Sequence, residues 1–145
     1  MKIYKIAAGR TLYHETNTDR VPSIVQNGLQ VGHGTNWKSG FGDTYGGDAI
    51  YAMESLQDAV LWAGKQDWAF NQDLGTGKVS IVEFIEDDDP WEIDAADPIS
   101  QTGQQGKWLK RLIPVDPSSI VRSFPVTPEL IRQKSKERDD RLFPN

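Results

Sequence analysis

Residues 11–29 read TLYHETNTDRVPSIVQNGL. The β-prone start of this stretch predicts a short strand that ends at His14, one of only two histidines in the chain. Asp19 then stands where a side chain can cap the start of a helix. Asn27 and Gly28 are typical of a helix end, because both residues tolerate the left-handed backbone conformation found there. The stretch therefore predicts a strand followed by a helix that ends at about Gly28.

Residues 48–63 repeat this order and read DAIYAMESLQDAVLWA. The apolar start predicts a second short strand, and Tyr51 lies in it. Ser55 followed three residues later by Asp58 resembles a capping box, which indicates that a helix begins there. Trp62 then falls about two turns into that helix.

The rest of the chain predicts further strands, loops and one more helix. Residues 78–86 (KVSIVEFIE) form the clearest strand and are expected to lie centrally in a sheet. Two later strands are predicted, joined by a turn at Asp116, and a charged helix follows from about residue 127; the later strands span 108–115 and 120–126. We expect an α+β fold in which antiparallel strands form two packed sheets with helices at the side.

Composition bounds the class of protein. The chain has 145 residues, of which 37% are hydrophobic, so we expect residues 1–145 to form one domain with one core. It has no cysteine, which excludes disulfides and thiolate metal sites. It has no long apolar run either, so the expectation is a soluble cytoplasmic protein. The net charge of −5 disfavours broad binding to phosphate backbones, although residues 107–111 are locally basic.

The two opening stretches together carry a resemblance to a known family. The pieces that match are Tyr13-His14-x-Thr16, residues 24–29, residues 47–52 and the aromatic Trp62. In their order and spacing they resemble the ADP-ribosyltransferases of the branch with a His, Tyr and Glu signature, which includes poly(ADP-ribose) polymerases and some bacterial toxins. The resemblance covers about the first half of the chain. It implies a split, twisted pair of sheets and NAD as the substrate.

The resemblance also implies roles for single residues. His14 and Thr16 would hold a ribose of NAD, while Tyr51 and Trp62 would enclose the nicotinamide ring. Because that ring is cationic, each aromatic contact would contribute about 0.5 to 2 kcal/mol. The bond to be cleaved joins nicotinamide to its ribose, and it breaks through an oxocarbenium-like state. We therefore expect the side chains of His14 and Tyr51 to face one pocket.

Two positions depart from the family pattern. The family glutamate precedes a late strand, where this chain has Gln104-Gln105-Gly106-Lys107, and Gln105 is our first candidate for its place. A chain without the glutamate is expected to transfer a single ADP-ribose or to be inactive, so it does not build chains. Glu15 stands where the family usually has glycine beside the nicotinamide amide, and it either crowds the pocket or turns outward.

The leading prediction is thus a small mono-ADP-ribosyltransferase that uses NAD to modify a macromolecule, either a protein or a nucleic acid. The acceptor is unknown, and a toxin, a phage modifier and a regulatory enzyme all suit the size. We expect the loop 94–106 to border the site and to select the acceptor. No metal is expected, because the adjacent carboxylates at 86–89 do not converge on one point.

Plainer interpretations remain open. Tyr51 and Trp62 can be core aromatics, and His33 lies in a loop, residues 32–47, where a solvated histidine is the common case. A second function is a non-catalytic module that binds an NAD-like nucleotide or a protein, which the missing carboxylate favours. A third is an RNA 2′-phosphotransferase, but that chemistry needs several arginines, and the first half of the chain offers only Arg10 and Arg20.

Overall fold

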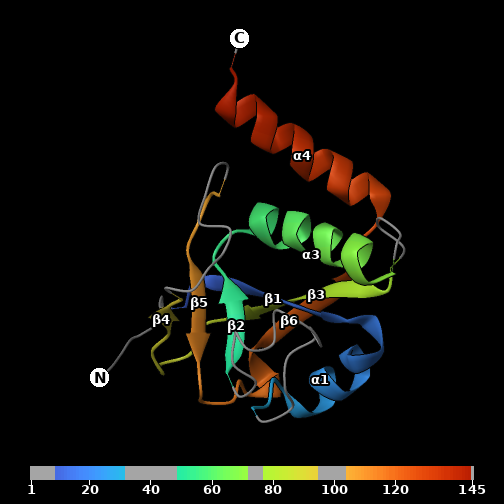
Figure 1. Ribbon diagram of the computed structural model, residues 1–145. Coiled ribbons are helices and arrows are strands. Elements are labelled where there is room, and N and C mark those ends of the chain that lie inside the picture. Colours follow the sequence, from blue (N-terminus) through green and yellow to red (C-terminus); the bar gives the residue numbers. More distant parts are fainter. Residues whose placement is uncertain (1–8, 32–48, 72–76, 95–103, 145) are drawn as a thin grey trace.

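The computed structural model describes residues 9–31, 49–71, 77–94 and 104–144. These form an α+β fold built on one antiparallel sheet of six strands (Figure 1). The predicted loops at 32–47 and 94–106, with His33 in the first, fall wholly or mostly outside the described residues. The strands are β1 (Thr11–Asn17), β2 (Ile50–Met53), β3 (Val79–Ile85), β4 (Glu92–Ile93), β5 (Trp108–Arg111) and β6 (Ile120–Pro125), and the α-helices are α1 (Val21–Asn27), α3 (Leu56–Asn71) and α4 (Pro128–Leu142).

The sheet has the order β4-β5-β2-β1-β3-β6, so β1 lies inside it. On one side β1 pairs with β3 along its whole length, from Thr11 opposite Ile85 to Asn17 opposite Val79. On its other side β1 pairs with β2 only where Tyr13 meets Met53. Strand β1 is therefore paired with β2 through far fewer residues than with β3.

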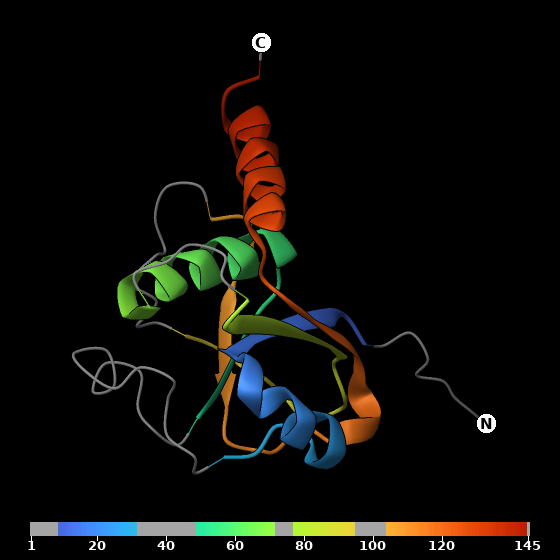
Figure 2. The same ribbon diagram turned by 90° about the vertical axis from the view of Figure 1, so that its right-hand side faces the viewer.

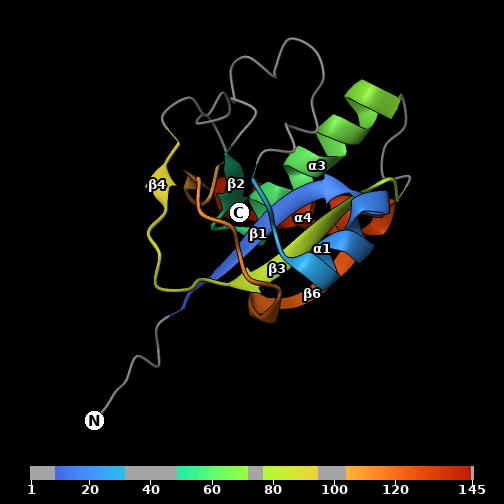
Figure 3. The same cartoon turned by 90° about the horizontal axis from the view of Figure 1, so that it is seen from below.

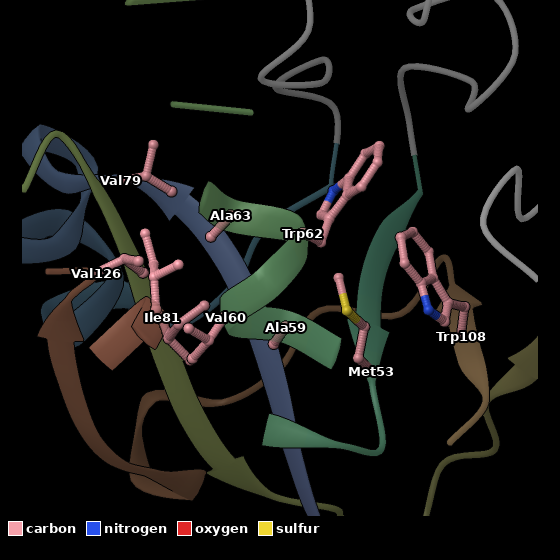
Figure 4. Close-up of a cluster of buried hydrophobic side chains, with 10 residues drawn as sticks. Met53, Ala59, Val60, Trp62, Ala63, Val79, Ile81, Trp108 and Val126 are labelled. Carbon is pink, nitrogen blue, oxygen red and sulfur yellow. The ribbon is translucent and has the colours of Figure 1, made fainter. Parts of the chain in front are cut away.

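The sheet carries a hydrophobic core on each face. On one face α3 and α4 cover a cluster that contains Met53, Val60, Ile81 and Trp108 (Figure 4). On the other face α1 covers a cluster that contains Leu12 and Phe84, among others (Figure 3). We call these the α3 face and the α1 face. Helix α4 crosses α3 and extends beyond the sheet (Figure 2).

Several helix and strand signals are confirmed, and others are wrong. Gly28 ends α1 with a positive φ of 82°, as expected, and Ser55 accepts a hydrogen bond from the amide of Asp58 at the start of α3. Asp19, in contrast, lies in a 3₁₀ turn and gives no side-chain cap to α1. Strand β1 also continues past His14 to Asn17, because its polar residues are paired with β3.

The predicted strand 108–115 ends early, at Arg111, because that side chain turns into the protein. The buried guanidinium of Arg111 pairs with Asp87 at 2.6 Å and donates hydrogen bonds to the carbonyls of Ile113 and Pro114. It also lies 4.7 Å from the centre of the Trp91 ring. The acidic run at 86–89 is therefore partly structural, and the hydrogen bond from Arg111 lowers the pKa of Asp87.

No helix among the described residues is long and apolar enough to cross a membrane.

Gly28, at the end of α1, and Gly77 share a left-handed backbone conformation but differ in how closely their surroundings are packed. Both have a φ of 82°, but a Cβ on Gly28 would lie 2.0 Å from the carbonyl oxygen of Val115, whereas one on Gly77 would have its nearest neighbour at 4.0 Å. We expect Gly77→Ala to lower the free energy of unfolding by about 1 to 2 kcal/mol from backbone strain. Gly28→Ala should cost at least about 3 kcal/mol, because it also disrupts the paired backbone of Leu29 and Val115. Urea unfolding of the two variants measures the difference, and equal losses would contradict it.

Candidate functional site

His14 joins the two strands that carry the matching motifs. Its Nδ1 lies 2.7 Å from the backbone carbonyl oxygen of Tyr51, and because a carbonyl can only accept, Nδ1 must carry the proton. Burial lowers the pKa of His14 from its ordinary value of 6.5, which the bond to Tyr51 only partly offsets. The imidazole is therefore neutral at pH 7, with the lone pair of Nε2 left as a hydrogen-bond acceptor.

The side chains of His14 and Tyr51 do not share a face of the sheet, so that expectation is wrong. Side chains alternate along a strand, and Ile50 and Ala52 belong to the α1-face cluster, which places Tyr51 on the α3 face. Leu12 likewise belongs to the α1-face cluster, which puts His14 on that face. The two residues are in contact through the hydrogen bond between the imidazole of His14 and the backbone carbonyl of Tyr51.

Thr16 follows His14 on the α1 face and is buried. It lies opposite Ser80 in the pairing of β1 with β3. The pair predicted to hold a ribose is thus on one face, with His14 only partly buried and Thr16 enclosed.

The two aromatic residues expected at the nicotinamide ring both belong to the α3 face but differ in burial. Trp62 is part of the core there, and its ring meets that of Trp108 edge to face, with 5.2 Å between centroids (Figure 4). Tyr51 lies in neither core cluster and is partly exposed. Burial raises the pKa of Tyr51, and the negative charge of Asp94 adds to the effect.

Glu15 is the departure from the family pattern that the structure resolves most clearly. It did not turn outward to solvent, because only 6% of the residue is exposed. Its position next to His14 in the strand directs it to the opposite, α3 face. On the β3 side, Glu15 lies opposite Ile81.

Gln105 lies elsewhere, against the start of α3. The backbone amide of Gln105 donates to both carboxylate oxygens of Asp58, at 2.9 and 3.1 Å. Its side-chain oxygen accepts a hydrogen bond from the hydroxyl of Ser55 at 2.8 Å. The next two amides are held in the same way, that of Gly106 by Asp58 at 2.8 Å and that of Lys107 by Glu54 at 2.6 Å. Carboxylates at the beginning of a helix therefore anchor the segment 104–107, and Gln105 is not brought beside His14.

Sequence reasoning missed two residues of the α3 face. Gln66 is 3% exposed and its Oε1 has no hydrogen-bond partner among the described residues. Asp94, which we expected to open a loop, is 4% exposed and its amide donates to the carbonyl of Trp108 at 2.8 Å. The spacing of Gln66, one turn after Trp62, was the available signal for it.

Comparison with known proteins adds no assignment. No model of a known protein family matches the chain, and no curated protein does. In the part of the chain that the structure describes, no group of three or more potential ligands is placed to hold a metal ion.

The anchoring of segment 104–107 can be tested by amide hydrogen exchange. Asp58→Ala should speed exchange at Gln105 and Gly106 by about tenfold or more, because hydrogen bonds to a charged acceptor contribute about 1.5 to 3 kcal/mol. Glu54→Ala is the matched control, since it should release only the amide of Lys107. Equal acceleration of all three amides in both variants would show that the carboxylates do not act separately.

The protonation of His14 can be followed by NMR. The imidazole should titrate below pH 6.5, with Nδ1 as the protonated nitrogen of the neutral form. Between this lower pKa and 6.5 the unfolded chain binds more protons than the folded one, so the free energy of unfolding should rise with pH across that window. A His33→Ala variant assigns the two imidazole signals, and a midpoint for His14 at or above 6.5 would contradict the burial of its ring.

Proposed function

We propose that this chain is a mono-ADP-ribosyltransferase that uses NAD as its substrate. The bond between nicotinamide and its ribose breaks, and nicotinamide leaves with the bonding electron pair. A nucleophile of the acceptor then bonds to the same ribose carbon and loses its proton. In this proposal the protein holds NAD in a bent conformation and stabilises the positive charge that develops on the ribose.

The observation that carries the proposal is the hydrogen bond between His14 and the backbone of Tyr51. It fixes the tautomer of His14 and aims a neutral acceptor, Nε2, away from β2. A ribose hydroxyl is a donor that suits this acceptor. His14 would therefore bind and orient a ribose, and it would not serve as an acid at pH 7, because burial lowers its pKa.

The opposite faces of His14 and Tyr51 are compatible with one long ligand. NAD has two riboses and two rings, so the histidine and the tyrosine need not contact the same part of it. Beyond the single pair of Tyr13 with Met53, β1 and β2 are not paired, and a dinucleotide lying there would meet both residues. The division of the sheet into two halves, which the family resemblance implies, would fall at this junction.

Tyr51 is the better candidate for stacking on the nicotinamide ring, because it is partly exposed. Trp62 supports it from within the core, where its ring already packs on Trp108. Gln105 in this proposal acts on the acceptor or on a ribose hydroxyl through its side-chain amide nitrogen, since its oxygen accepts from Ser55. An amide cannot act as a general base, which agrees with transfer of a single unit and not of chains.

A non-catalytic binding module is the second candidate. The observation that favours it is the engagement of Gln105, whose backbone amide and side-chain oxygen are both bound at the start of α3. A segment held in this way is suited to a fixed recognition surface. The module would bind an NAD-like nucleotide or a protein without breaking the glycosidic bond.

Labelled NAD distinguishes the two candidates. The full chain, incubated with NAD labelled in its adenine half and a cell lysate, should transfer label to the protein or the nucleic-acid fraction and release nicotinamide. His14→Ala should weaken NAD binding by about 0.5 to 3 kcal/mol, the range for lost hydrogen bonds, while Gln105→Ala should lower transfer more than NAD affinity. Binding of NAD without label transfer or nicotinamide release would support the binding module. Unchanged NAD affinity in His14→Ala would remove that residue from the site.

A further inference from the structure

We propose that Glu54 supplies the negative charge that faces the ribose of NAD while its bond to nicotinamide breaks. The inference rests on the proposed function, in which positive charge develops on that ribose. The side chains assigned to the site so far are uncharged at pH 7, and they are His14, Thr16, Tyr51, Trp62 and Gln105. A reaction that creates a cation therefore has no anion among them to stabilise it.

Glu54 lies where the end of β2 meets the start of β5 (Figure 1). The last residue of β2, Met53, pairs with Trp108, and the next residues of the two strands are also bound to each other. The backbone amide of Glu54 donates to the carbonyl of Lys107 at 3.0 Å, and Oε1 of Glu54 accepts from the amide of Lys107 at 2.6 Å. These bonds hold the carboxylate in one place, as preorganised electrostatic stabilisation requires.

Gly106 leaves the room that this carboxylate occupies. A Cβ at residue 106 would lie 3.0 Å from the Cβ of Glu54 and 3.4 Å from its Oε1, so a side chain there would displace the carboxylate. The residue before Gly106 is Gln105, which in the proposed function acts on the acceptor or on a ribose hydroxyl. The carboxylate of Glu54 and the side chain of Gln105 therefore belong to the same end of the sheet.

Glu54 retains an excess of negative charge although it pairs with Arg10. The guanidinium of Arg10 donates to Glu54 through Nη1, and it donates to both carboxylate oxygens of Glu86, from Nε at 2.9 Å and from Nη2 at 3.1 Å. One cation thus serves two carboxylates, which leaves the three side chains with a net charge of −1. Because the bidentate contact is the one with Glu86, the charge of Glu54 is the less compensated of the two.

Two further carboxylates contact the neighbours of Glu54, and both are less suited to face a ligand. Asp58 is only 7% exposed, and its oxygens accept from the backbone amides of Gln105 and Gly106. Glu86 is bound on both oxygens by Arg10. The side chain of Glu54 is 29% exposed, so part of it is open to a ligand.

The spacing between Tyr51 and Glu54 suits a ring and the ribose attached to it. Three residues of extended chain span about 10 Å. With the nicotinamide ring stacked on Tyr51, its ribose can lie between that ring and the carboxylate of Glu54. As the bond breaks, nicotinamide leaves with the electron pair and the positive charge moves from the ring to the ribose. The attraction of Glu54 therefore grows toward the transition state, which raises the rate more than the affinity.

Release of nicotinamide by the full chain tests this role, measured with NAD labelled in its nicotinamide half and a cell lysate as the acceptor. Glu54→Gln removes the charge but keeps an oxygen that can accept from the amide of Lys107. It should lower the maximal rate of release by about 10²- to 10³-fold, the loss expected when one preorganised group that faces a developing charge is removed. The affinity for NAD in calorimetry should stay within about twofold. An unchanged rate would overturn the inference.

Arg10→Gln separates the effect of charge from that of structure. Both Arg10→Gln and Glu54→Gln break the ion pair between these residues, but only Glu54→Gln removes negative charge. Because an exposed ion pair contributes little to stability, Arg10→Gln should keep the rate within about threefold. An equal loss of rate in the two variants would mean that the ion pair acts only on the structure, and it would overturn the inference.

Glu83→Gln is the matched control for net charge. Glu83 also pairs with an arginine, Arg122, at 2.8 Å, and this variant should keep the wild-type rate. If Glu54→Gln does not fold, Gly106→Ala displaces the carboxylate without removing its charge and should lower the rate at unchanged NAD affinity. An unchanged rate in Gly106→Ala would then overturn the inference. The proposed function stands as long as the wild type releases nicotinamide, and a wild type that neither releases it nor transfers label would overturn both.

Discussion

The alternation of side chains along β1 is the constraint on which the rest of the structure depends. The strand is covered on both faces, so Leu12 enters one core and Tyr13 the other. Its register is set by seven consecutive pairs with β3, from residue 11 to residue 17. A shift of one residue would exchange the two faces and bury the wrong set of side chains. His14 and Glu15 are adjacent in sequence, and for this reason they serve different faces of the molecule.

Much of the fold could be predicted from local patterns, and the failures have identifiable causes. Strand β3 was predicted within one residue at each end, because an apolar run bounded by charged residues has few alternatives. Strand β4 has two residues, Glu92 and Ile93, and is defined only by its pairing with β5. The early end of β5 depends on Arg111, whose buried guanidinium binds Asp87 and the carbonyl of Asp89, 24 and 22 positions away, and such contacts leave no periodic signal. Contacts between distant segments decided each of these cases.

The candidate site shows the same division between local and distant information. The motif located Tyr51 and His14 on adjacent strands, but it did not tell which face each side chain takes, because this depends on the register between β1 and β2. The segment around Gln105 was expected to approach the cofactor. Three backbone amides instead bind carboxylates of the helix start, a contact between residues about 50 positions apart. The burial of Gln66 follows from the packing of α3 over the sheet, and in the sequence only its spacing from Trp62 indicates the shared helix face.

The burial of Arg111 also changes how the basic stretch at 107–111 is to be understood. All of its described polar contacts are internal, since the guanidinium is bound by Asp87 and by main-chain carbonyls. One of the three cations of this stretch is thus removed from the surface of a chain whose net charge is −5. Attraction of a polyanion depends on releasing its condensed counterions at exposed cations. Within this stretch, a nucleic acid used as acceptor would therefore meet at most the cations of Lys107 and Lys110.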